Sequence, residues 1–141
     1  MPYDEEDPPY ANLVEPPAAL DELARAVIGA AIEVHKELGP GLPEEAYQRA
    51  MESELRLRGI PFERQKRIVV TYKGEPVALA KIDLVVGGML IVELKAVEAI
   101  AKIHVLQART YMRILKQPLA LLINFNVPVL KEGIRRVVET I

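Results

Sequence analysis

The stretch KIDLVVGGMLIVELK, residues 81–95, decides how this chain folds. Two aliphatic runs flank a Gly-Gly pair, a pattern that is typical of two β-strands joined in a hairpin. The same strands carry Asp83, Glu93 and Lys95. Because an unpaired charge is costly inside a strand, the sequence predicts that these three groups act together.

The register of this hairpin determines whether the carboxylates can meet, because directly opposed residues of antiparallel strands project from one face. A plain two-residue Gly-Gly turn would place Asp83 opposite Val92 and direct Glu93 to the other face. A shift of one residue, through a three-residue connection or a bulge, places Asp83 opposite Glu93. We predict this odd register, with Lys95 on the same face and a glycine, rather than Met89, in the left-handed conformation.

Outward from the hairpin, hydrophobic spacing predicts helices and strands in the order ααβββαβα. The helices are expected over residues 20–38, 43–58, 98–116 and 128–139, and the strands on either side of Lys73-Gly74, over 89–97 and over 119–125. A helix joins the third strand to the fourth, so those two strands should be parallel. The fold class is therefore α/β, with a mixed four-stranded sheet flanked by helices.

Charge divides the chain into two parts. Residues 1–17 hold five acidic residues, no basic residue and five of the 11 prolines, so we expect a flexible acidic arm that folding does not require. The net charge is −2, which leaves +3 on residues 18–141. Half of the residues are apolar, and the length suits one core, so we expect residues 18–141 to form a single domain.

Several kinds of protein are excluded by what the sequence lacks. Without cysteine there are no disulfides and no thiolate zinc sites. Ser53 is the only serine and lies in a predicted helix, and two histidines, His35 and His104, are too few for a histidine-rich zinc site. No apolar run is long enough to span a membrane, and the acidic N-terminus is unlike a signal peptide, so we expect a cytoplasmic protein.

Two carboxylates and one amine on adjacent strands are suited to a hard cation such as Mg²⁺, or Mn²⁺, bound through oxygen. An amine beside the cation can position or help to deprotonate a water molecule. The alternative is a surface ion pair on a solvated sheet. The aliphatic residues around Asp83, Glu93 and Lys95 favour the cation site.

The spacing D-x9-E-L-K, from Asp83 to Lys95, resembles the active-site signature of the PD-(D/E)xK nuclease superfamily. Within that superfamily, GLPEEAY, with Gly41, Glu44 and Tyr47, is similar to the motif that names the GxxExxY family. The segments AIEVHKELGPGL, IVELKAV and LLINFNVP also resemble that family, over about residues 20–138. The proline usual before the aspartate is replaced by Ile82.

The resemblance implies a restriction-endonuclease-like core and assigns roles to the residues. Asp83, Glu93, the Leu94 carbonyl and Glu44 would hold the metal, and Lys95 would serve the water. QARTY, with Gln107 and Tyr111, resembles a Gln-x-x-x-Tyr motif of exonucleases.

Four residues of the predicted helices could also have a purely structural role instead of a functional one. Glu44 could favour its helix N-terminus through the dipole alone, Gln107 and Tyr111 could be ordinary packing, and His35 could be a core histidine.

The predicted function is Mg²⁺-dependent cleavage of nucleic acid, DNA rather than RNA, by attack of water on phosphorus. The alternatives are a non-catalytic nucleic-acid-binding or protein-assembly module and a metal-dependent hydrolase acting on a nucleotide-like molecule. A basic cluster could meet a phosphate backbone or be only a solvated surface: Arg56, Arg58, Arg64, Lys66 and Arg67. Because the chain is small, we expect a homodimer or a partner protein to help hold the substrate.

Overall fold

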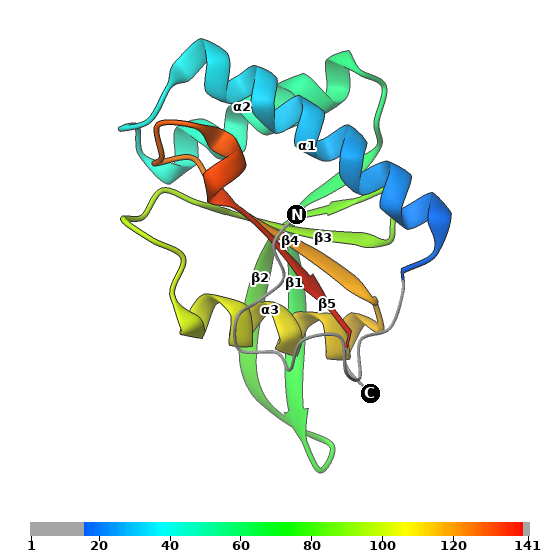
Figure 1. Ribbon diagram of the computed structural model, residues 1–141. Helices are drawn as coiled ribbons and strands as arrows, with labels where there is room; N and C mark the ends of the chain where they lie inside the picture. Colours follow the sequence, from blue (N-terminus) through cyan, green and yellow to red (C-terminus); the bar gives the residue numbers. More distant parts are fainter. Residues whose placement is uncertain (1–15, 140–141) are drawn as a thin grey trace.

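The computed structural model describes residues 16–139, which form one mixed sheet between two layers of helices (Figure 1). The helices are α1 (Ala18–Leu38), α2 (Glu44–Leu57) and α3 (Lys102–Leu115); the strands are β1 (Phe62–Tyr72), β2 (Glu75–Val86), β3 (Leu90–Lys95), β4 (Leu119–Asn124) and β5 (Ile134–Val138); and a 3-10 helix, η1 (Leu130–Gly133), precedes β5. The strand order is β1-β2-β3-β4-β5. Among the strand pairs of residues 16–139, β3 and β4 alone are parallel, with α3 between them in the chain, as predicted.

Two hydrophobic cores cover the two faces of the sheet. The first lies under α1 and α2, and the second lies under α3. Strands β3 and β4 are buried almost throughout, because they run through the centre of the sheet with helices on both sides. The predicted mixed α/β architecture is confirmed. Among the described residues, no helix is long and apolar enough to cross a membrane.

The prediction of a last helix over 128–139 and of a four-stranded sheet is wrong. The segment forms η1 and then β5, which pairs antiparallel with β4 and gives the sheet a fifth strand. Ile134, Val137 and Val138 are spaced as on a helix face, yet Ile134 and Val138 enter the first core while Val137 enters the second. The segment forms a strand instead of a helix because the buried edge of β4 would otherwise leave its backbone N–H and C=O groups without hydrogen bonds.

The connection from β3 to α3 is longer than predicted, because a buried side chain holds it as a loop. The Asn124 side chain accepts a hydrogen bond from the Val97 N–H (3.1 Å) and donates one to the Val97 carbonyl (2.9 Å). The strand therefore ends at Lys95, and α3 begins at Lys102 instead of near residue 98. His104 Nδ1 accepts a hydrogen bond from the Ala101 N–H at this helix start (2.9 Å).

The side chains of Tyr47, Phe125 and His35 hold the loops together at one end of the molecule. The Tyr47 hydroxyl donates to the Gly39 carbonyl (2.6 Å) and accepts from the Leu42 N–H (3.1 Å), so it closes the connection between α1 and α2. Its ring stacks on Phe125, with 4.5 Å between centroids. His35 Nε2 lies 2.8 Å from the Val127 carbonyl, which makes this histidine a satisfied core residue.

The predicted arm, residues 1–17, lies outside the described residues except for Pro16 and Pro17. The Pro17 carbonyl accepts the first hydrogen bonds of α1, from the N–H groups of Leu20 and Asp21 (both 3.0 Å). A deletion that stops at residue 15 therefore keeps this helix start.

We expect deletion of residues 1–15 to shift the melting temperature by only a few degrees, because an acidic, proline-rich composition contributes little to a core. Thermal unfolding followed by circular dichroism measures this shift. A collapse of the cooperative transition would show that the segment is an integral part of the domain.

Candidate functional site

The β2–β3 hairpin has the predicted odd register. Val86 pairs with Leu90, which leaves three residues in the connection. Gly87 and Gly88 take positive φ angles of 60° and 72°, and the Met89 N–H donates to the Val86 carbonyl (3.2 Å). Glycine therefore supplies the left-handed conformation, as expected, and the register brings the two carboxylates opposite each other.

Asp83 and Glu93 lie where β2 separates from β3. Backbone pairing between these strands ends at Leu84 and Val92, and beyond that point side chains take its place. Glu93 Oε2 accepts a hydrogen bond from the Asp83 N–H (2.9 Å), and Asp83 Oδ2 accepts one from the Leu94 N–H (2.8 Å). Each carboxylate thus holds the opposite strand, and both are fixed in one small region.

At Asp83, the side chains of β2 change the face of the sheet to which they point, and Gln65 on β1 lies opposite this position. Leu84 belongs to the core under α1 and α2, whereas Ile82, two residues earlier, belongs to the core under α3. Opposite Asp83, Gln65 has φ 48° and drops out of the ladder between its paired neighbours. Its Nε2 lies 3.5 Å from Asp83 Oδ1. A left-handed non-glycine residue in a strand is strained, and such strain clusters at functional sites.

Burial dominates the electrostatics of this region. Burial and, after it, the negative charge of Asp83 raise the pKa of Glu93 to about 8, while the hydrogen bond from the Asp83 N–H and the Lys95 ammonium act in the opposite direction. Without a bound metal ion, Glu93 therefore favours its protonated form at neutral pH. A buried glutamate beside a half-buried aspartate is expected at a cation or catalytic site, because the cost of burying the charge must be offset by a ligand or a proton.

Both helical layers contribute side chains near the carboxylates. The pKa of Glu44, the first residue of α2, is raised by burial and by Asp83 and lowered by Lys95. The pKa of Tyr111, on α3, is raised by burial, Glu93 and Asp83. These interactions place Glu44 and Tyr111 at the same site as the predicted metal ligands.

The remaining polar side chains of this α3 face are less closely tied to the site. Burial and the Lys95 charge lower the pKa of His104, whose Nδ1 already caps the helix. Gln107 is exposed, and its side chain makes no hydrogen bond within residues 16–139. The structure therefore brings together Asp83, Glu93, Lys95, Glu44 and Tyr111, but leaves Gln107 in solvent.

Gln48 and Glu52, on α2, form a buried network that sequence reasoning missed. Gln48 Nε2 donates to the Asp83 carbonyl (3.0 Å) and to Glu52 Oε2 (2.8 Å). Arg64 Nε, on β1, lies 3.1 Å from both Glu52 oxygens. The network joins α2 to the strand backbone at Asp83. No sequence motif indicated it, since a polar pair four residues apart on a helix is more often exposed.

We expect Gln48→Met to lower the free energy of unfolding by about 1–2 kcal/mol, because it removes two buried hydrogen bonds and keeps the side-chain volume. Chemical denaturation measures the change. Arg49→Met, on the exposed side of the same helix turn, is the matched control and should change stability by less than about 0.5 kcal/mol. Equal effects of the two substitutions would contradict a structural role for this network.

A cleft of about 610 Å³ opens beside Asp83, between α2 and the β1–β2 hairpin. It is lined by Glu44, Glu45, Gln48, Arg64, Gln65, Arg67, Lys81 and Asp83. Acidic groups come from α2 and from Asp83, and basic groups come from the two strands. Asp83 is therefore reached from an open, charged groove, whereas Glu93 is buried and does not line it.

The oxygen donors of this site fit a metal ion in part. Asp83 and Glu93 offer hard carboxylate oxygens at one point, which suits Mg²⁺ or Mn²⁺. In the described part of the chain, however, no three His, Asp or Glu side chains come close enough together to form a metal cluster. Glu44 lines the same cleft but does not complete a three-carboxylate group. The fit thus depends on two carboxylates with backbone oxygen and water.

Comparison with protein families gives a match to a model described as the PD-(D/E)XK nuclease superfamily, over residues 21–137. The chain belongs to the PD-(D/E)XK nuclease superfamily. The match extends from α1 to β5, and membership suggests nuclease activity on nucleic acid. PD-(D/E)XK nucleases generally use divalent metals. Neither the curated proteins nor the solved structures give a significant match.

Proposed function

We propose that this PD-(D/E)XK protein is a metal-dependent nuclease that hydrolyses phosphodiester bonds of nucleic acid, with DNA as the substrate. The observation that carries the proposal is the pairing of Asp83 and Glu93 where β2 leaves β3. The high pKa of Glu93 fits a site whose charge is balanced by a cation when it works. Family membership supports the reaction class but not the particular substrate.

Each residue at the site has a proposed role. Asp83, Glu93 and the Leu94 carbonyl would hold Mg²⁺ or Mn²⁺, and Glu44 would reach the ion through water from the first turn of α2. The bound ion would neutralise charge that develops on the phosphate oxygens. Lys95 would position the attacking water and take part in its deprotonation. Tyr111 would orient the phosphate from α3, and Gln107 would contact the substrate from the exposed part of the same helix face.

Within the superfamily we assign the chain to the GxxExxY family, on Gly41, Glu44 and Tyr47. The structure gives two of these residues separate tasks that support the assignment. Tyr47 closes the loop that contains Gly41 through hydrogen bonds on either side of it, and this fixes the start of α2. Glu44 then lines the cleft beside Asp83.

Cleavage assays with the full chain test the proposal. Labelled single- and double-stranded DNA and RNA are incubated with Mg²⁺, Mn²⁺ or EDTA, and the products are separated by size. We expect cleavage of DNA with either metal and none with EDTA. Binding that is unaffected by EDTA and yields no products would instead favour a non-catalytic nucleic-acid-binding module.

A further inference from the structure

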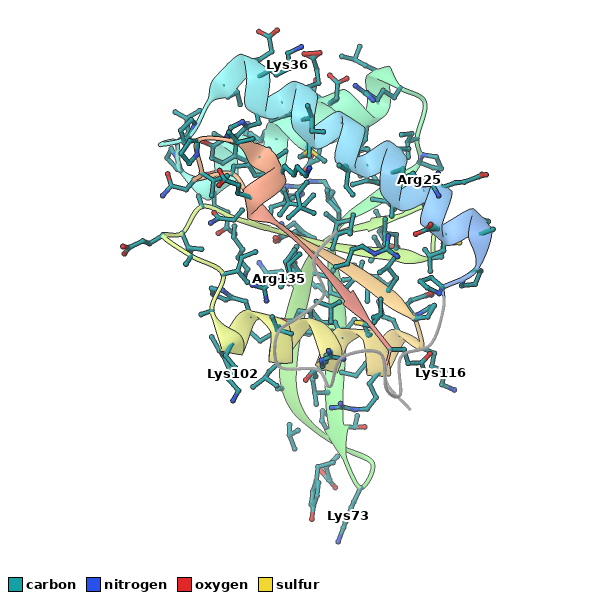
Figure 2. All side chains as sticks on the ribbon, in the orientation of Figure 1. Arg25, Lys36, Lys73, Lys102, Lys116 and Arg135 are labelled. Carbon is teal, nitrogen blue, oxygen red and sulfur yellow. The ribbon has the colours of Figure 1, made fainter. Side chains whose placement is uncertain are left out.

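The cleft beside Asp83 continues along one face of the long β1–β2 hairpin. This hairpin extends past α3, and Lys73 lies at its tip (Figures 1 and 2). Arg67 on β1 and Lys81 on β2 are directly opposed, and both line the cleft together with Asp83. Their neighbours Ile68 and Ala80 pack under α3, so the two cations face away from that helix.

The opposition of Arg67 and Lys81 is unfavourable for the hairpin alone, because like charges directly across a strand pair repel. Other cations nearby have partners: Arg64 bonds to Glu52 and Lys66 to Glu63. Within residues 16–139, neither Arg67 nor Lys81 forms an ion pair with a carboxylate. Two exposed cations that lie side by side in a cleft, with no ion pair of their own among the described residues, are suited to an anion.

The position of this pair relative to Asp83 matches the repeat of a nucleotide chain. Lys81 lies two residues from Asp83 on one strand, which is about 6.6 Å along the strand. Neighbouring phosphates of a nucleotide chain have a comparable separation. The next opposed pair on the same face, Val69 and Leu79, is apolar, with exposed fractions of 53% and 65%. The row of cations that leads from Asp83 along the hairpin, here called the track, therefore ends before this pair.

We propose that Arg67 and Lys81 bind the phosphate next to the scissile one, so that a nucleotide chain runs from Asp83 along the hairpin. This inference rests on the proposed nuclease function. It makes the substrate a polynucleotide with at least two consecutive phosphates, instead of an isolated phosphodiester. It also selects Arg67 from the basic cluster of the sequence, in which Arg56 and Arg58 pair with glutamates of α2.

The double variant Arg67→Gln/Lys81→Gln tests the track. The matched control, Lys36→Gln/Lys131→Gln, removes the same charge at exposed positions of α1 and η1. Figure 2 shows Lys36 at the opposite end of the molecule from the hairpin tip. A labelled oligonucleotide is used for cleavage kinetics with Mn²⁺ and for equilibrium binding in EDTA, each over a range of salt concentrations.

We expect the hairpin variant to raise Kd and KM about tenfold and to reduce the salt dependence of binding by about one phosphate contact, with a smaller change in kcat. The control should match the wild type. Its melting temperature tests folding, and the hairpin variant should melt no lower because a repulsion has been removed.

The outcomes separate this inference from the proposed function. If the wild type cleaves and the hairpin variant behaves like the control, the track is wrong while the nuclease function stands. If no protein cleaves but only the hairpin variant loses binding, the nuclease function fails, and Arg67 and Lys81 stand only as a phosphate-binding pair beside Asp83. Absence of binding by the wild type would overturn the track as well.

Discussion

Lys95→Ala is expected to lower the rate of phosphodiester cleavage by about 10²–10⁴-fold. Lys95 ends β3, two residues from Glu93, and its charge lowers the pKa of both Glu93 and Glu44. An amine held there can position the attacking water and share its proton. Because the lysine is not one of the proposed metal ligands, Mn²⁺ affinity should change only a few fold.

Single-turnover cleavage at saturating Mn²⁺ measures this effect. Lys95→Arg keeps the positive charge but cannot accept a proton, so it should also be severely impaired if the amine takes part in deprotonation. Lys131→Ala, at an exposed position of η1, is the control for loss of a lysine. Full activity of Lys95→Ala would remove this residue from the mechanism.

Glu93→Gln is expected to stabilise the metal-free protein at alkaline pH. The folded-state pKa of Glu93 is about 8, above the usual 4.5 for a glutamate, so the folded state binds the extra proton. Its contribution is therefore favourable at low pH, and stability falls as the pH rises from 4.5 to about 8. The loss is on the order of 4 kcal/mol, and a neutral glutamine avoids it while still accepting the Asp83 N–H.

Urea unfolding in EDTA between pH 5 and pH 9 measures this difference, with pH points spaced by about one unit across the expected titration. The wild type should lose stability across the range, whereas Glu93→Gln should keep a flatter profile. Glu22→Gln, exposed on α1, is the control and should follow the wild type. Parallel profiles for wild type and Glu93→Gln would show that Glu93 is ionised in the folded protein at neutral pH.

The central hairpin could be predicted from sequence because its local chemistry leaves few choices. Two adjacent glycines permit the left-handed connection, and only an odd register lets Asp83 and Glu93 meet. The crossover between β3 and β4 followed from the helix between them. These inferences depend on neighbours in the chain, which is why they hold without knowledge of the tertiary structure.

The parts that sequence could not predict depend on long-range contacts. The spacing of Ile134, Val137 and Val138 fits a helix as well as a strand, and only the open edge of β4 decides between them. The positive φ of Gln65 and the bond from Gln48 to the Asp83 carbonyl have no sequence signal, since both arise where α2 and β1 approach β2. The site is therefore supported by residues outside the motif.

The most direct test of the account is a calorimetric titration of the full chain with Mn²⁺ at pH 7, in Hepes and in Tris. The buffers differ in ionisation enthalpy, so the comparison counts protons released. We predict one bound ion per chain and release of nearly one proton from Glu93, with binding strongly weakened by Asp83→Asn and by Glu93→Gln. Mn²⁺ affinity unchanged in both variants would contradict the proposal that these two carboxylates share a metal ion.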